Sequence, residues 1–240
     1  VFLQVRLTTM MVFRGIRLGT LLTFIFLILL GNPNLLLVLI NNNSVIYGYP
    51  GDILTYVHGN WQNFLFSTSV PGQFIFIILM KIFTYIFGSI TGYNILLAIS
   101  FIVSFGSMYL LARNFFSTQV SLVSAFLYES SLYLQWNSMA HFEITLASSF
   151  LPLYIHYLIK FLRFISDRGR LINRELLISA LIFAVIFMIS FQIGYFLLVL
   201  TICLFVFNSL RRREDNKVSL INKRTLVIYV TFFVLCFIFT

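Results

Sequence analysis

Long apolar runs alternate with short polar stretches along almost the whole chain. The first run is Leu18–Ile40, and Gly31-Asn32-Pro33-Asn34 interrupts it. We expect a kink or an early exit there, because proline removes a helix hydrogen bond. The later runs that could cross a bilayer as helices are Asn94–Ala112, Thr118–Leu134, Ile144–Leu162, Leu176–Phe191, Ile193–Phe207 and Leu226–Thr240. The pattern predicts an all-α, multi-span membrane helix bundle.

Two apolar segments do not fit a simple single crossing. The residues from Leu176 to Phe207 are too many for one span, and Gln192-Ile193-Gly194 near their middle predicts a tight turn between two short helices. The segment Gln73–Phe87 is about one span long but carries Lys81 at its centre. Hydropathy alone therefore leaves open whether Gln73–Phe87 crosses the membrane.

Composition assigns the protein to the membrane without the help of any motif. Hydrophobic residues make up 60% of the 240 residues and charged residues only 10%, whereas a soluble domain carries about 25% charged residues. A net charge of +9 would suggest a nucleic-acid partner for a soluble protein. Here the basic residues cluster between apolar runs, so membrane topology explains them and we expect no nucleic-acid partner.

The distribution of lysine and arginine decides between the possible topologies. If the N-terminus is cytoplasmic and Gln73–Phe87 does not cross, every basic residue except Lys81 lies on the cytoplasmic side. If the segment crossed, Arg113 and the cluster from Lys160 to Arg174 would move outside. Because basic residues favour the cytoplasmic side, we predict seven crossings and an interfacial or re-entrant helix at 73–87 on the outer face.

The predicted organisation is a single transmembrane domain over residues 1–240 of a multi-pass protein of the cell membrane. Residues 41–93 form its first extracytoplasmic loop. The last apolar run reaches Thr240 without a polar cap, so we expect the chain to continue beyond it. Cys203 and Cys236 lie inside apolar runs, where packed thiols are expected rather than a disulfide or a metal pair.

Asp52 is the candidate catalytic residue on the outer face. It follows the turn Tyr49-Pro50-Gly51 and stands where a helix could begin, so its carboxylate could cap that helix. A carboxylate at the membrane edge could also orient an acceptor hydroxyl, take its proton or hold a divalent metal ion. The two roles are compatible, because a capping carboxylate keeps spare lone pairs.

The same loop holds two further candidates, His58 and Trp61. On an ideal helix His58 and Asp52 would not share a face unless the helix is broken, and Gly59 could break it. His58 could bind substrate or make hydrogen bonds at the interface. Trp61 could belong to an aromatic belt or stack on sugar rings. The third histidine, His156, lies in an apolar run, where packing or snorkelling is expected.

His141 and Glu143 stand two residues apart in the next outer loop. On an extended segment they would share a face, whereas on a helix they would diverge by about 200°. Glu143 could simply be a first-turn acid favoured by the helix dipole, and His141 could be a hydrogen-bonding loop residue. Glu129, at the outer end of the third run, could bond to Tyr128, Tyr133 or a neighbouring helix, or act in a cavity.

The order of these features resembles the polytopic membrane glycosyltransferases of the GT-C type. Those proteins have an N-terminal span, an outer loop with an acid soon after the membrane exit, a proline-containing helix along the membrane and then a string of short spans. The matching stretches here are Tyr49-Pro50-Gly51-Asp52, Val70-Pro71-Gly72-Gln73, Phe87-Gly88, Gly92-Tyr93-Asn94-Ile95-Leu96-Leu97, Met139-Ala140-His141-Phe142-Glu143 and Leu151-Pro152-Leu153. The likeness covers roughly residues 15 to 210, in order and spacing rather than as one exact motif.

The resemblance implies a GT-C-like bundle that transfers a sugar from a polyprenyl-phosphate-linked donor to an acceptor on the outer face of the membrane. It implies that Asp52 acts on the acceptor or on a metal ion, and that His141 and Glu143 contact the donor phosphate or the acceptor. Lys81 is the one basic candidate for the donor phosphate on that side. Many members carry two adjacent acids in the first loop, whereas only Asp52 is present here.

We therefore expect a lipid-linked sugar transferase with Asp52 as base or acceptor-orienting group. The alternative is a non-catalytic multi-pass membrane protein, either a transporter component or a scaffold subunit. A transporter should show broken helices in paired halves and polar residues at mid-membrane. This sequence has few such residues and no visible duplication, which favours the enzyme.

Overall fold

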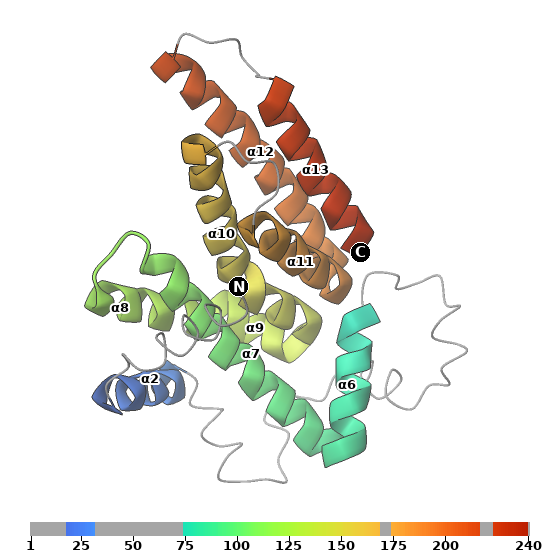
Figure 1. The fold of residues 1–240 in the computed structure, drawn as a ribbon. Helices are drawn as coiled ribbons and strands as arrows, with labels where there is room; N and C mark the ends of the chain where they lie inside the picture. The colour runs from blue at the N-terminus through green and yellow to red at the C-terminus, as the bar shows by residue number, and fades with distance from the viewer. Residues whose placement is uncertain (1–17, 32–73, 169–173, 217–222, 240) are drawn as a thin grey trace, which may run out of the picture.

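The computed structural model describes residues 18–31, 74–168, 174–216 and 223–239, and the elements that it describes there are α-helices (Figure 1). The all-α class predicted from the apolar runs is therefore confirmed. The helices are α2 (Leu18–Gly31), α6 (Phe74–Phe87), α7 (Ser89–Ala112), α8 (Thr118–Glu129), α9 (Leu132–Ala140), α10 (Phe142–Arg168), α11 (Arg174–Ile189), α12 (Phe191–Asn216) and α13 (Lys223–Phe239).

Three of the described helices are long and apolar enough to cross a bilayer. The stretches that meet this length are Ile90–Ala112, Phe142–Arg163 and Phe191–Asn208. Two shorter apolar helices lie at Leu22–Gly31 and Ile75–Phe87. The membrane helix bundle is thus confirmed, while the count of seven crossings stays a prediction. The interruption predicted in the first run continues past Gly31 into residues outside the described part of the chain, so it also stays a prediction.

A sharp bend at Gly88 separates α6 from α7. Gly88 has a φ of 83°, a conformation that glycine adopts without steric cost. Beyond the bend, Gly92 lies directly against the α6 backbone, because a Cβ at this position would stand 2.5 Å from the carbonyl oxygen of Phe83. The expected separate helix at 73–87 is confirmed, and its place at the membrane interface stays a prediction.

The run Thr118–Leu134, predicted as one span, is divided between α8 and α9. The hydroxyl of Ser130 donates to the carbonyl of Phe126 at 2.7 Å, and the hydroxyl of Ser131 accepts from the amide of Leu134 at 3.5 Å, as a helix N-cap does. Two adjacent serines therefore end one helix and begin the next, because their hydroxyls compete with the backbone for hydrogen bonds. The single continuous helix predicted here is wrong, and whether the run crosses the membrane stays a prediction.

The turn predicted at Gln192-Ile193-Gly194 lies slightly earlier, at Ser190, between α11 and α12. Gly194 is inside α12 and packs against Phe187 of α11, where a Cβ would come within 2.5 Å of the Phe187 ring. The glycine allows two helices to approach closely and does not itself make the turn.

Helix α10 runs through Pro152, and its neighbours supply the hydrogen bonds that the proline disturbs. Proline has no N–H to donate to the carbonyl four residues earlier, which is that of Ser148. Tyr128 of α8 donates its hydroxyl to this carbonyl at 2.8 Å. The next carbonyl, of Ser149, accepts from the hydroxyl of Ser107 in α7 at 2.7 Å. Such replacement is required where water is absent.

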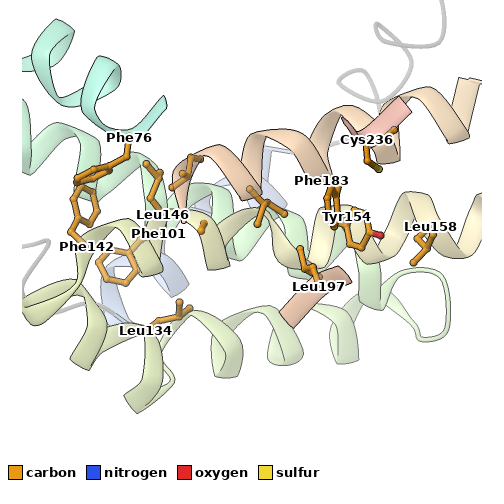
Figure 2. Close-up of a cluster of buried hydrophobic side chains, with 14 of the residues drawn as sticks. Phe76, Phe101, Leu134, Phe142, Leu146, Tyr154, Leu158, Phe183, Leu197 and Cys236 are labelled. Atoms are coloured by element: carbon orange, nitrogen blue, oxygen red, sulfur yellow. The ribbon is translucent and has the colours of Figure 1, made fainter. Parts of the chain in front are cut away.

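The buried core follows α10 and joins it to α7, α9 and α11. Figure 2 shows Phe76 and Phe142 in contact at one end of this cluster, with a centroid distance of 5.8 Å. Further along, the hydroxyl of Tyr154 shares a hydrogen bond of 2.5 Å with that of Thr201 in α12. One continuous core therefore links the junction of α9 and α10 to the C-terminal helices.

Both cysteines are free thiols, as predicted. Cys236 is buried in the core near Tyr154 (Figure 2), whereas Cys203 is exposed on α12. The packed environment predicted for Cys203 is wrong, because this side of α12 carries the exposed apolar residues Val199, Ile202 and Val206. An apolar exposed face of this kind suits contact with lipid or with another protein.

We predict that Tyr128→Phe destabilises the protein by about 1 kcal/mol, because the Ser148 carbonyl loses its hydroxyl donor. In the Pro152→Ala background the restored N–H can serve this carbonyl, so the same substitution should cost less. Denaturant unfolding of the purified protein in detergent measures both losses. Tyr133→Phe, which removes an exposed hydroxyl, is the control and should change little. Equal losses in the two backgrounds would contradict this account of the proline.

A second prediction concerns the bend between α6 and α7. Gly92→Ala should lower stability by about 1–3 kcal/mol, since the new methyl group meets the Phe83 carbonyl. Gly106→Ala in the same helix is the matched control: its Cβ would meet no atom within 4 Å. That control should be neutral or stabilising by up to about 1 kcal/mol, because alanine is the better helix former. Thermal unfolding of both variants checks the difference, and similar melting temperatures would refute the close contact.

Candidate functional site

The junction of α9 and α10 brings His141 and Glu143 together. Helix α9 ends at Ala140, and Glu143 stands in the first turn of α10. His141 between them has φ −142° and ψ 71°, which is not helical. As a result, Nδ1 of His141 lies 3.7 Å from Oε1 of Glu143. The sequence left open whether these side chains share a face, and the single non-helical residue makes them do so.

The two side chains differ in exposure: that of His141 is 61% exposed and that of Glu143 only 19%. Because the imidazole is largely exposed and stands 3.7 Å from the carboxylate, the contact between them contributes little to folding stability. The contact with Glu143 involves Nδ1, which leaves Nε2 as the ring nitrogen able to bind a ligand. The pair therefore offers a hydrogen-bonding imidazole and an orienting carboxylate, which suits a phosphate oxygen or a hydroxyl group.

Aromatic side chains from two other helices hold the junction in place. Phe142, which follows His141, is buried between Phe76 of α6 and Tyr93 of α7, with centroid distances of 5.8 Å and 5.1 Å. The hydroxyl of Tyr93 also donates to the carbonyl of Ser138 in α9 at 3.1 Å. The position of the His141–Glu143 pair thus depends on α6 and α7 as well as on its own helices.

Lys81, the predicted basic residue of the outer face, is half-buried in α6. It belongs to the helix whose Phe76 packs on the junction (Figure 2). The structure therefore brings the helix of Lys81 to the junction of His141 and Glu143. A role of Lys81 toward a donor phosphate stays a prediction.

Asp52, His58 and Trp61 lie outside the described residues, and so does any metal ion held by Asp52. Their roles stay predictions. Within the described segments, no group of three or more histidine, cysteine, aspartate or glutamate side chains could hold a metal ion.

Glu129 is fully buried at the end of α8 and lies against the end of α2. A Cβ on Gly31 would stand 2.5 Å from Oε2 of Glu129, so a larger residue at this position would require the carboxylate to shift. The side-chain amide of Gln135 in α9 donates to the carbonyl of Gly31 at 3.5 Å. Glu129 and Gln135 thus pack the end of α2 against the two short helices, and a bond of Glu129 to Tyr128, Tyr133 or a neighbouring helix stays a prediction.

His156 lies well away from the pair, toward the other end of α10. It is buried, as expected for a packed residue, and its Nδ1 shares a hydrogen bond of 2.7 Å with Nδ2 of Asn114. Nearby, the guanidinium of Arg163 lies over the ring of Phe115 at 5.6 Å. The hydrogen bond of His156 therefore attaches the segment that connects α7 with α8 to helix α10.

The family model for dolichyl-phosphate-mannose-protein mannosyltransferases matches residues 71–238, which is more than half of the chain. Neither the curated proteins nor the solved structures gave a match. The protein is a membrane glycosyltransferase of the kind that uses a polyprenyl-phosphate-linked sugar. The chain belongs to the dolichyl-phosphate-mannose-protein mannosyltransferase family. The match contains Lys81, His141 and Glu143, and it begins after Asp52.

Sequence reasoning named His141 and Glu143 but not the residues that position them. Tyr93 and Phe142 stood only inside strings quoted for the resemblance. One feature of the sequence could have indicated Phe142 as a positioning residue: it is apolar and stands between two polar residues. A buried side chain there fixes the segment and directs both neighbouring side chains toward the surface. The partner on α7 could not be read from the sequence, since many aromatic residues are equally suited to it.

Proposed function

We propose that this protein transfers a sugar from a polyprenyl-phosphate-linked donor to an acceptor hydroxyl on the outer face of the membrane. The observation that carries the proposal is the family match over residues 71–238, which includes the built junction of His141 and Glu143. A pair that adds little to stability yet is held by buried aromatic rings has the character of a binding group.

In the proposed reaction the acceptor oxygen attacks the anomeric carbon of the donor sugar. Asp52 takes the acceptor proton as the new carbon–oxygen bond forms. The bond between the anomeric carbon and the phosphate oxygen breaks, and its electron pair leaves with the polyprenyl phosphate. His141 and Lys81 donate hydrogen bonds to the phosphate oxygens, while Glu143 orients His141 through Nδ1.

The dimensions of α10 support the outer-face assignment. Glu143 and Arg163 are twenty residues apart on this helix, or about 30 Å, which equals the hydrocarbon thickness of a bilayer. Lys160 and Arg163 lie toward the same end as Arg113 and are exposed. The positive-inside rule assigns that end to the cytoplasm. His141 and Glu143 are then expected on the opposite side, where the lipid-linked sugar would be used.

We predict that Asp52→Asn abolishes sugar transfer while leaving membrane insertion intact. Loss of a general base lowers the rate by about 10²–10⁴-fold. Transfer of radiolabelled sugar by the full chain in reconstituted membranes measures the effect, with polyprenyl-phosphate mannose as the first donor because the family description names mannose. Asp167→Asn, the same change near the far end of α10, is the control and should transfer normally. Normal transfer by Asp52→Asn would exclude Asp52 as the base.

Glu143→Gln should lower kcat/KM for the same transfer by about tenfold, because an amide no longer orients the imidazole as a carboxylate does. Glu175→Gln is the matched control, since Glu175 is also a first-turn acid, in α11. Both variants lose a similar helix-dipole interaction, about 0.3–1 kcal/mol. Equal transfer rates in the two variants would mean that Glu143 serves only its helix.

A further inference from the structure

Tyr93 of α7 contacts both helices that flank His141. Its side chain is 1% exposed, so it lies wholly within the bundle. Its hydroxyl donates to the carbonyl of Ser138 in α9 at 3.1 Å. Its ring packs edge-to-face on Phe142 of α10 at a centroid distance of 5.1 Å. A single buried side chain therefore links the two sides of the one non-helical residue at the junction.

The bond from Tyr93 satisfies a carbonyl that α9 leaves open. Helix α9 ends at Ala140, so Ser138 carries one of its last four carbonyls, which have no partner within the helix. Ser138 is completely buried, and an unsatisfied carbonyl in such a place is strongly unfavourable. The amide of His141 bonds instead to the carbonyl of Asn137 at 2.8 Å. The hydroxyl of Tyr93 thus fixes the end of α9 one turn before His141.

The other links across the junction cannot replace this bond. Phe76 packs on the ring of Phe142, which is an apolar contact with α10 and has no hydroxyl to offer an open carbonyl. The hydroxyl of Thr145 donates to the carbonyl of Leu134 at 3.3 Å, which joins α9 to α10 farther from His141. That second link holds the two helices together, so removing the hydroxyl of Tyr93 should loosen the junction without unfolding it.

We propose that Tyr93 is a positioning residue that sets the geometry of the His141–Glu143 pair. The assignment rests on the proposed function, because it gives that pair a part in sugar transfer. Nδ1 of His141 and Oε1 of Glu143 stand 3.7 Å apart across the junction. His141 is bonded to both helices, because its amide donates to the carbonyl of Asn137 in α9 and its carbonyl accepts from the amide of Ile144 in α10 at 2.9 Å. A shift of α9 relative to α10 therefore changes the backbone torsion angles of His141 and with them the direction of its ring toward Glu143.

The test compares Tyr93→Phe with Tyr154→Phe in the full chain in membranes. Each variant keeps its buried ring and loses one hydroxyl that bonds to another helix, since Tyr154 bonds to Thr201 of α12. Tyr93→Phe should lower kcat/KM for sugar transfer by about tenfold, because a small misplacement of a binding group is costly. Tyr154→Phe should change kcat/KM by less than about twofold, since a comparable hydroxyl is lost far from the pair.

A second readout does not depend on activity. Diethyl pyrocarbonate modifies exposed histidines, and peptide mass spectrometry gives the rate at His141. That rate should change by about twofold or more in Tyr93→Phe and stay constant in Tyr154→Phe, because the local surroundings of an exposed imidazole set its reactivity. His156 is buried and should remain unmodified in both variants, which checks that each is folded.

Double variants with Glu143→Gln complete the test. If Tyr93 acts through the pair, its substitution should cost much less activity when Glu143 is already replaced. Equal behaviour of Tyr93→Phe and Tyr154→Phe in both readouts would overturn the positioning role. If the reactivity of His141 responds to Tyr93→Phe but Glu143→Gln transfers sugar normally, the positioning role stands and the proposed part of the pair in transfer fails.

Discussion

The structure depends on one constraint: each backbone carbonyl left open where a helix breaks needs a donor, because lipid and buried protein offer no water. Two tyrosines on neighbouring helices meet this need. Tyr128 serves the carbonyl of Ser148 below Pro152, and Tyr93 serves that of Ser138 at the end of α9. Phenylalanine would fill the same space but leave both carbonyls open. The hydroxyl groups of these two tyrosines therefore allow helices inside an apolar bundle to be interrupted.

The breaks in turn create the candidate site. On a continuous helix His141 and Glu143 would diverge by about 200° and would not lie side by side. The serine pair that ends α8 and the single residue His141 between α9 and α10 produce one short helix, α9, that ends beside the first turn of α10. That end presents His141 and holds Glu143 beside it. The chemistry of the site is thus a consequence of how the chain departs from uninterrupted spans.

Much of the helix pattern follows from the sequence, and the exceptions have physical causes. The runs Asn94–Ala112 and Ile144–Leu162 correspond to α7 and α10 because length and hydropathy determine such helices. The division at Ser130 and Ser131 was missed, since hydropathy does not register hydroxyls that bond to the backbone. Gly194 was misread as a turn, because a glycine at a helix contact has the same sequence signal as a glycine at a bend. Tyr93 was missed because its partners are distant in the sequence.

The contact between Gly31 and Glu129 has a consequence for the order in which the chain enters the membrane. A lone carboxyl group in hydrocarbon costs about 2.5–3.5 kcal/mol on insertion. Helix α2 precedes α8 in the chain, so Gly31, which receives the Glu129 carboxylate, is synthesised well before the acid. Because synthesis starts at the amino end, the glycine is made before the carboxyl group that packs against it. A circular permutation that moved α2 behind α8 would reverse this order, and Glu129 would then be synthesised before the glycine that receives it.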